Sequence, residues 1–210
     1  MLSLASSWNS GLCRHDMTIG DPALTPPQLL ALRHAPISWR NELRFLLLFD
    51  ARMQSVVIAG REPLLTRMKL AWWREALNKP ADQRPKGEPL LAEISMLEGA
   101  GAPLVAQAAE LLVDAWEEVA DPDQVDAEVL ARHRQGRGDA VFVHFAGRAG
   151  EAENLRLAGQ VWSGAVADSQ IPALPRSGRA FALLARASLV EQSPSRLSLV
   201  PFFWHALTGF

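Results

Sequence analysis

Cysteine and lysine are both scarce in this chain of 210 residues. Cys13 is the only cysteine, so neither an intramolecular disulfide nor a thiolate metal cluster can form, which suits a reducing compartment. Lysine occurs only at Lys69, Lys79 and Lys86, and the net charge of −2 lacks the basic excess of a typical nucleic-acid-binding domain. We therefore expect no nucleic-acid partner.

Long apolar runs are absent as well. The apolar stretch 45–49 is far shorter than the roughly 20 residues that a membrane-spanning helix needs. The first residues lack the basic start and the sustained apolar stretch of a secretory signal. The five histidines are scattered without metal-binding spacing. These absences predict a cytoplasmic protein without a metal site.

Helical periodicity is the main positive signal. Apolar residues recur at spacings of three and four, prolines and glycines separate the periodic segments, and no sustained period-two alternation is present. The length and the 49% apolar content suffice for one core. The sequence predicts an all-α, single-domain bundle of roughly eight helices over residues 25–210, preceded by a flexible segment at 1–24.

Some segment boundaries follow from proline and glycine. Residues 78–89 are rich in proline and charge, which predicts a surface loop and a candidate for disorder. Pro103 is expected to open a helix to about residue 119, with Leu104 and Leu111 facing inward. The glycines in the run 136–139 should interrupt or bend the helix that Asp126 caps. Further helices are expected at about 152–168 and 197–207.

The stretch 43–77 organises the chain and reads as two helices. The first ends near Ala59, where Gly60 is expected to provide a left-handed C-cap, and Pro63 starts the second. Helical spacing puts two arginines, Arg67 and Arg74, two turns apart. It also gathers other residues of the second helix on one side: Leu65, Met68, Trp72, Glu75 and Ala76.

Asp50 is the unusual residue of the first helix. It shares an apolar stripe with Leu46 and Met53, and a buried unpaired carboxylate is costly, so it needs a partner or a shifted pKa. Arg67 and Arg74 are the nearest candidate partners in sequence. Two interpretations stay open, namely a structural ion pair inside the bundle and a group that lines a binding pocket.

Three motifs carry a family resemblance. Phe49-Asp50-Ala51-Arg52, then Arg61-Glu62-Pro63-Leu64-Leu65, then Met68-Lys69-Leu70-Ala71-Trp72-Trp73-Arg74-Glu75-Ala76-Leu77 resemble the signature region of the squalene/phytoene synthase family. The likeness is greatest to a divergent branch that includes mitochondrial complex I assembly factors and short bacterial homologues. It implies a bundle of the isoprenoid-synthase (trans-prenyltransferase) type. Enzymes of this family hold two prenyl diphosphates through Mg²⁺, with aspartates on two facing helices.

The sequence departs from this pattern at both aspartate motifs. Positions Gln54, Ser55 and Ile58 carry no acid where the first motif is expected, and the second region, 155–169, offers only Asp168. The resemblance, with both motifs missing, therefore implies a non-catalytic factor that needs no cofactor. Such a factor would bind a lipid or a protein, and respiratory complex I assembly is one role it implies. The alternative is an active prenyl-diphosphate condensing transferase that uses Mg²⁺ and a rebuilt site.

The candidate pocket consists of two acids and three residues of the helix that Pro63 starts. Its residues are Asp50, Arg67, Trp72, Arg74 and Asp168. Expected partners are a prenyl diphosphate or another lipid, or a respiratory-chain assembly protein. A third hypothesis is a helical scaffold whose exposed aromatics bind another protein. Phe202, Phe203 and Trp204 could instead give peripheral contact with the inner membrane, since tryptophan favours the interface.

Overall fold

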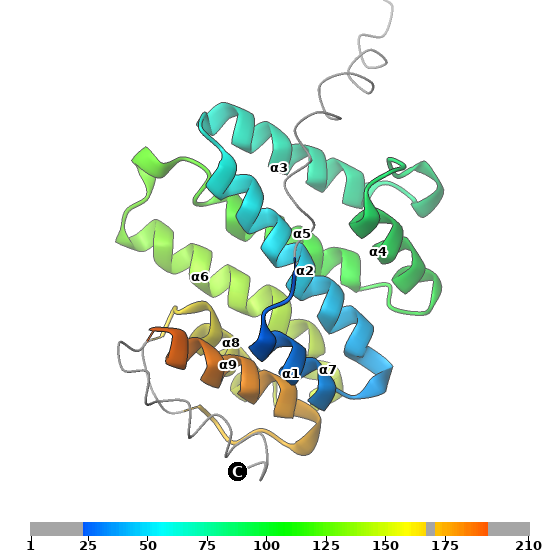
Figure 1. The fold of residues 1–210 in the computed structure, drawn as a ribbon, viewed down its shortest axis with the longest axis vertical. Coiled ribbons are helices and arrows are strands. Elements are labelled where there is room, and N and C mark those ends of the chain that lie inside the picture. The colour runs from blue at the N-terminus through cyan, green and yellow to red at the C-terminus, as the bar shows by residue number, and fades with distance from the viewer. Residues whose placement is uncertain (1–22, 167–170, 193–210) are drawn as a thin grey trace, which may run out of the picture.

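A long central helix, α2, organises the computed structural model, which describes residues 23–166 and 171–192 (Figure 1). All regular structure in these ranges is helical, so the all-α prediction is confirmed. The α-helices are α1 (Pro26–His34), α2 (Ile37–Ala59), α3 (Pro63–Asn78), α4 (Pro89–Gly99), α5 (Val105–Glu117), α6 (Ala127–Phe142), α7 (Ala146–Ala149), α8 (Ala152–Ser163) and α9 (Arg179–Gln192). Short 3₁₀ segments are η2 (Ala81–Gln83), η3 (Pro122–Gln124), η4 (Val143–Phe145) and η5 (Arg176–Gly178).

Helix α2 is buried on nearly all sides. The consecutive residues 45–50 are all buried, as expected for a helix enclosed by others rather than one with a single apolar face. It packs against α1, α3, α4, α5 and α6. Figure 1 shows α3 and α4 at one end of the molecule and α1, α8 and α9 at the other, with α5 and α6 between them. Among the described helices, none has the length and apolarity needed to cross a membrane.

Aromatic side chains fill the interior around α2. The ring of Trp39 lies 4.9 Å from that of Phe145, and Phe145 in turn lies 5.3 Å from Phe181. Phe142 contacts both Phe181 and Trp162, at 4.9 and 5.4 Å between ring centroids. These contacts join α2, α6, η4, α8 and α9 through close packing, and burying each large ring contributes on the order of 2 kcal/mol or more.

Helix α6 crosses α8 at two glycines. A Cβ atom on Gly138 would lie 2.5 Å from the carbonyl oxygen of Gly159, and one on Gly159 would lie 2.7 Å from that of Gly138. The two backbones are therefore in contact at this point. The expected interruption at 136–139 was wrong, because α6 continues to Phe142 and Gly138 serves helix packing instead of ending the helix.

The link between α2 and α3 follows the prediction in position but not in conformation. Pro63 opens α3 and Gly60 follows α2, as expected. Gly60 has φ −70°, so the predicted left-handed cap was wrong. Glycine is required there because a Cβ would lie 1.9 Å from Oγ1 of Thr66. That contact fixes α3 against the end of α2.

The expected burial of two leucines was wrong. Leu104 and Leu111 were expected inward but are 61% and 49% exposed, because α5 turns its other face to α2 and α3. The loop 79–88 is anchored, since the buried Arg84 binds Glu98 through both of its terminal nitrogens and donates to the carbonyl of Leu77. Helix α8 ends at Ser163, earlier than predicted, with Gly164 as a left-handed cap. The helix predicted at 197–207 lies outside the described residues.

The α6–α8 crossing predicts a strong effect of a single methyl group. Gly138→Ala should lower the free energy of unfolding by about 2–3 kcal/mol or more, since the new Cβ meets backbone atoms that cannot move aside. Gly147→Ala is the matched control, because a Cβ on this helical glycine has open space around it. Urea denaturation of both variants would measure this, and equal effects would contradict the crossing.

Candidate functional site

Asp50 lies in the core and is fully engaged. It is 2% exposed, and both carboxylate oxygens accept hydrogen bonds from Arg137 of α6. The Nε of Arg137 lies 2.8 Å from Oδ1, and its Nη2 lies 2.7 Å from Oδ2. The indole Nε1 of Trp116, on α5, donates to Oδ1 at 2.9 Å. Of the two interpretations of Asp50, the observed geometry is that of the structural ion pair.

Aromatic rings enclose the guanidinium of Arg137. Its central carbon lies 4.3 Å from the ring centroid of Trp162 and 5.6 Å from that of Trp116, which is the range of cation–π attraction. Burial alone would lower the pKa of Arg137, but the adjacent Asp50 carboxylate raises it above its ordinary value. Arg137 therefore remains charged, and the ion pair connects α2, α5, α6 and α8.

His133 completes this cluster, one turn before Arg137 on α6. Its ring packs against Trp116 at 4.5 Å between centroids, and its Nδ1 lies 2.8 Å from the carbonyl oxygen of Ala115, to which it donates. Burial lowers the pKa of His133 below the ordinary value of 6.5. The histidine is therefore neutral at neutral pH and holds α6 against α5.

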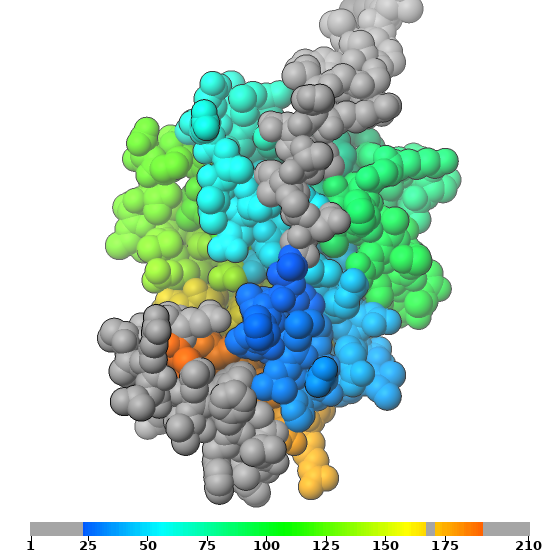
Figure 2. Space-filling model, in the orientation of Figure 1, coloured from blue at the N-terminus to red at the C-terminus, as the bar shows by residue number. Residues whose placement is uncertain are grey.

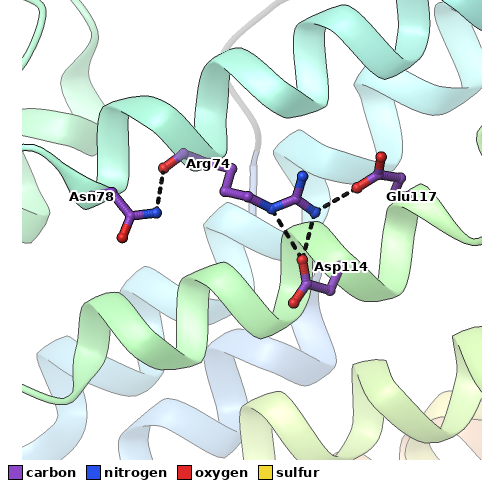
Figure 3. A network of polar contacts seen from close by, with 4 residues as sticks. All are labelled: Arg74, Asn78, Asp114 and Glu117. Carbon is purple, nitrogen blue, oxygen red and sulfur yellow. Dashed lines mark hydrogen bonds and ion pairs between the residues drawn. The ribbon is translucent and has the colours of Figure 1, made fainter.

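The arginines expected beside Asp50 lie elsewhere, and the prediction that they pair with it was wrong. Arg74 points from α3 toward α5, where its guanidinium binds Asp114 and Glu117 (Figure 3). Its Nε lies 3.2 Å from Oδ1 of Asp114. The hydrogen bonds that Arg74 donates to Glu117 and Asp114 raise its pKa. Arg67 lies two turns earlier on α3, and its Nη2 is 3.7 Å from Oδ2 of Asp121.

These two arginines line a surface cavity of about 460 Å³ between α3, α5 and α6. Charges of both signs line it, with three acids and three bases among the lining residues. Arg132 of α6 contributes the third guanidinium, which binds Glu118. The lining residues are Arg67, Arg74, Asp114, Glu117, Glu118, Gln124, Val129 and Arg132. Such a surface can bind groups of either charge by exchanging the partners of its ion pairs.

Trp72, another candidate residue, is not among the residues that line this cavity. Trp72 is half-buried and packs edge-on against Trp73, with ring centroids 5.1 Å apart. Asp168 lies outside the described residues, as do Phe202, Phe203 and Trp204. Asp50 lies in the core, whereas Arg67 and Arg74 lie on the surface, so these predicted pocket residues do not share one pocket.

Sequence reasoning missed a second buried acid on α2. Glu42 is 5% exposed and accepts hydrogen bonds from both terminal nitrogens of Arg148, at 2.6 and 2.8 Å. Nε2 of His144 lies 2.8 Å from the same carboxylate. Burial alone would raise the pKa of Glu42, but Arg148 and His144 lower it overall. Burial lowers the pKa of His144. The sequence did contain a signal for this acid, because Glu42 precedes Asp50 by eight residues, a spacing that puts both on one face of α2.

Within 23–166 and 171–192, no three His, Cys, Asp or Glu side chains are placed to hold one metal ion. Comparison of the chain with family models, with curated proteins and with solved structures gave no match. The resemblance to the squalene/phytoene synthase family therefore rests on the sequence motifs of residues 49–77.

Removing the charge of Asp50 should destabilise the protein strongly. Asp50→Asn leaves the guanidinium of Arg137, whose side chain is only 20% exposed, without its counter-ion, so we expect the free energy of unfolding to fall by about 2–4 kcal/mol. Arg132→Gln breaks a surface ion pair instead and should change stability little. Chemical denaturation would compare the two.

A double substitution separates charge from packing at the same place. Asp50→Leu combined with Arg137→Met replaces the pair by apolar groups and should recover most of the stability lost in Asp50→Asn. If the double variant is no more stable than Asp50→Asn, the ion pair is not the source of the effect.

Stability should decrease on mild acidification. His133 and His144 both have pKa values lowered by burial, so below about pH 6.5 the unfolded chain takes up protons that the folded chain does not. The free energy of unfolding should therefore fall as the pH drops below 6.5, and His133→Asn should reduce this slope. Urea denaturation across this range measures it, and a rise in stability toward acid would contradict the assignment.

Proposed function

We propose that this chain is a non-catalytic protein of the squalene/phytoene synthase type that binds a partner, without a cofactor, and that one role is in respiratory complex I assembly. The isoprenoid-synthase type of the bundle is part of this proposal. One observation carries the non-catalytic assignment, namely that both oxygens of Asp50 are bound to Arg137 in the core. A carboxylate held in this way does not fit a Mg²⁺ ion that must bridge it to a diphosphate.

The packed interior favours a partner on the outside of the bundle. The space around α2 is filled by Phe45, Phe49, Phe142, Phe145 and Phe181, all among the largest fully buried side chains. A prenyl chain in that region would have to displace several of these rings, at a cost of several kcal/mol. This supports a protein partner over a lipid held inside the bundle.

The charged cavity between α3, α5 and α6 supports the same conclusion. Arg67 and Arg132 have side chains that are 46% and 49% exposed, and each forms an ion pair with a carboxylate, that of Asp121 at 3.7 Å and that of Glu118 at 3.1 Å. Exposed ion pairs of this kind contribute little to stability, so they can exchange for charged groups of a partner at low cost. The cavity is therefore the best-supported docking site for an assembly partner.

Calorimetry with farnesyl diphosphate, with and without Mg²⁺, tests the non-catalytic assignment. We expect no Mg²⁺-dependent binding and no release of diphosphate, because Asp50 is unavailable to the metal. Mg²⁺-dependent binding with turnover that Asp168→Ala abolishes would instead establish the transferase alternative. Deletion of the gene with an assay of complex I activity tests the assembly role, and unchanged activity would contradict it.

A further inference from the structure

Helix α5 has one exposed side. It packs against α2, α3, α4 and α6. Figure 1 shows α2 crossing in front of α5 with α6 along one edge of the bundle, and Figure 2 shows α6, coloured yellow-green, at the same edge of the surface. Leu104, at the N-cap of α5, and Leu111, two turns later, are 61% and 49% exposed. The exposed side therefore begins with two leucines that the core does not use.

A second surface cavity, of about 370 Å³, lies between this side of α5 and α6. The two helices approach closely at its floor, where a Cβ on Gly136 would lie 3.2 Å from the Cβ of Ala115. Ala140, one turn further along α6, extends this floor, and Leu111 borders it on α5. Small residues along the base make the cavity concave. We call it the α5–α6 groove.

Negative charge exceeds positive charge along the α5 wall of the groove. Arg74 is shared by two carboxylates, those of Asp114 and Glu117, so these three residues keep one net negative charge (Figure 3). Glu110 lies one turn before Asp114, and burial together with the charge of Asp114 raises the pKa of Glu110. A cation would be attracted to this wall.

The α6 wall has the same excess. Arg132 is shared by Glu118 and Glu128, which again leaves one net negative charge. Nε of Arg156 lies 3.6 Å from Oδ1 of Asp139, beyond hydrogen-bonding distance, and burial raises the pKa of Asp139. That oxygen is buried and accepts no hydrogen bond from the part of the chain that the structure describes. With its ion pairs counted, the groove is therefore still negative.

We propose that the α5–α6 groove binds a basic amphipathic helix of a protein partner. The apolar side of such a helix packs onto the small-residue floor and covers Leu104 and Leu111, while its flanking lysines or arginines pair with the excess carboxylates. The same charge disfavours nucleic acid and anionic lipid. This inference rests on the proposed function, because the groove shares Asp114, Glu118 and Arg132 with the docking cavity.

Fluorescence anisotropy of a labelled synthetic helix tests the proposal on the full chain. The probe is a peptide of about 20 residues with leucines along one side, lysines on both flanks and alanines elsewhere, which is long enough to be helical. We expect saturable binding that weakens with added salt, because exposed charges are screened. The same peptide with glutamates in place of the lysines should bind at least about tenfold more weakly.

Substitutions in the groove separate its apolar and charged contributions. Leu104→Ser with Leu111→Ser should weaken binding of the lysine peptide at least about tenfold, because the leucines of the peptide lose their contacts. Glu118→Gln with Asp139→Asn should weaken binding by about fivefold or more and reduce its salt dependence.

Two matched controls use exposed residues that do not line the groove. Ile58→Ser with Met96→Ser removes two apolar side chains that are 75% and 68% exposed. Glu75→Gln with Asp82→Asn removes two exposed acids. Neither pair should change the binding of the lysine peptide.

Three results would overturn the proposal, namely no binding by the wild type, equal binding of the glutamate peptide, and equal binding by the leucine variant. A dimer of the free chain that Leu104→Ser with Leu111→Ser dissociates would also overturn it, since the groove would then hold a second copy. Peptide binding with unchanged complex I activity after gene deletion would support the groove and contradict the assembly role. Lost complex I activity without peptide binding would do the reverse.

Discussion

The rest of the structure depends on the buried ion pair between Asp50 and Arg137. Taking a carboxylate and a guanidinium largely out of water costs several kcal/mol for each ion, so the pair persists only because strong hydrogen bonds replace much of the lost hydration. Arg137 binds both oxygens of Asp50 along one edge, Trp116 adds a third donor, and Trp162 covers the guanidinium face. The partners come from four helices that are distant in sequence. A charged group of this kind favours one arrangement of the bundle, because any other would leave a buried charge unpaired.

The glycine crossing brings Trp162 over this ion pair. Arg137 directly precedes Gly138, where α6 and α8 approach to backbone contact. A larger residue at either glycine would push α8 outward and take Trp162 away from the guanidinium. The small residue Gly138 therefore lies next to the charged Arg137 because the close approach of α6 and α8 is what puts Trp162 against the guanidinium. His133 and the carbonyl of Ala115 fix the other side of α6, so that this helix is held in position relative to both α5 and α8.

The sequence predicted the helices well, because proline and glycine mark their ends and apolar spacing marks their faces. It also predicted that Asp50 is buried and needs a partner. It could not identify Arg137, which is 87 positions away, since only the packing of α6 on α2 brings the two together. Leu111 shows a second limit, because helical spacing defines its stripe on α5 but not whether a neighbouring helix covers that stripe. The opposite error occurred for Gly138, where a residue that usually ends helices serves instead to bring two helices together.

The position of Arg137 between two indoles makes the helix junction visible to spectroscopy. A positive charge beside an indole shifts the energy of its excited state, and Trp116 and Trp162 are two of the seven tryptophans of the chain. Separation of α6 from both α5 and α8 would remove that charge from both rings at once and admit water to them. The intrinsic fluorescence of the protein therefore contains a built-in reporter of its central junction. It would distinguish opening of the bundle from fraying at the chain ends without any added label.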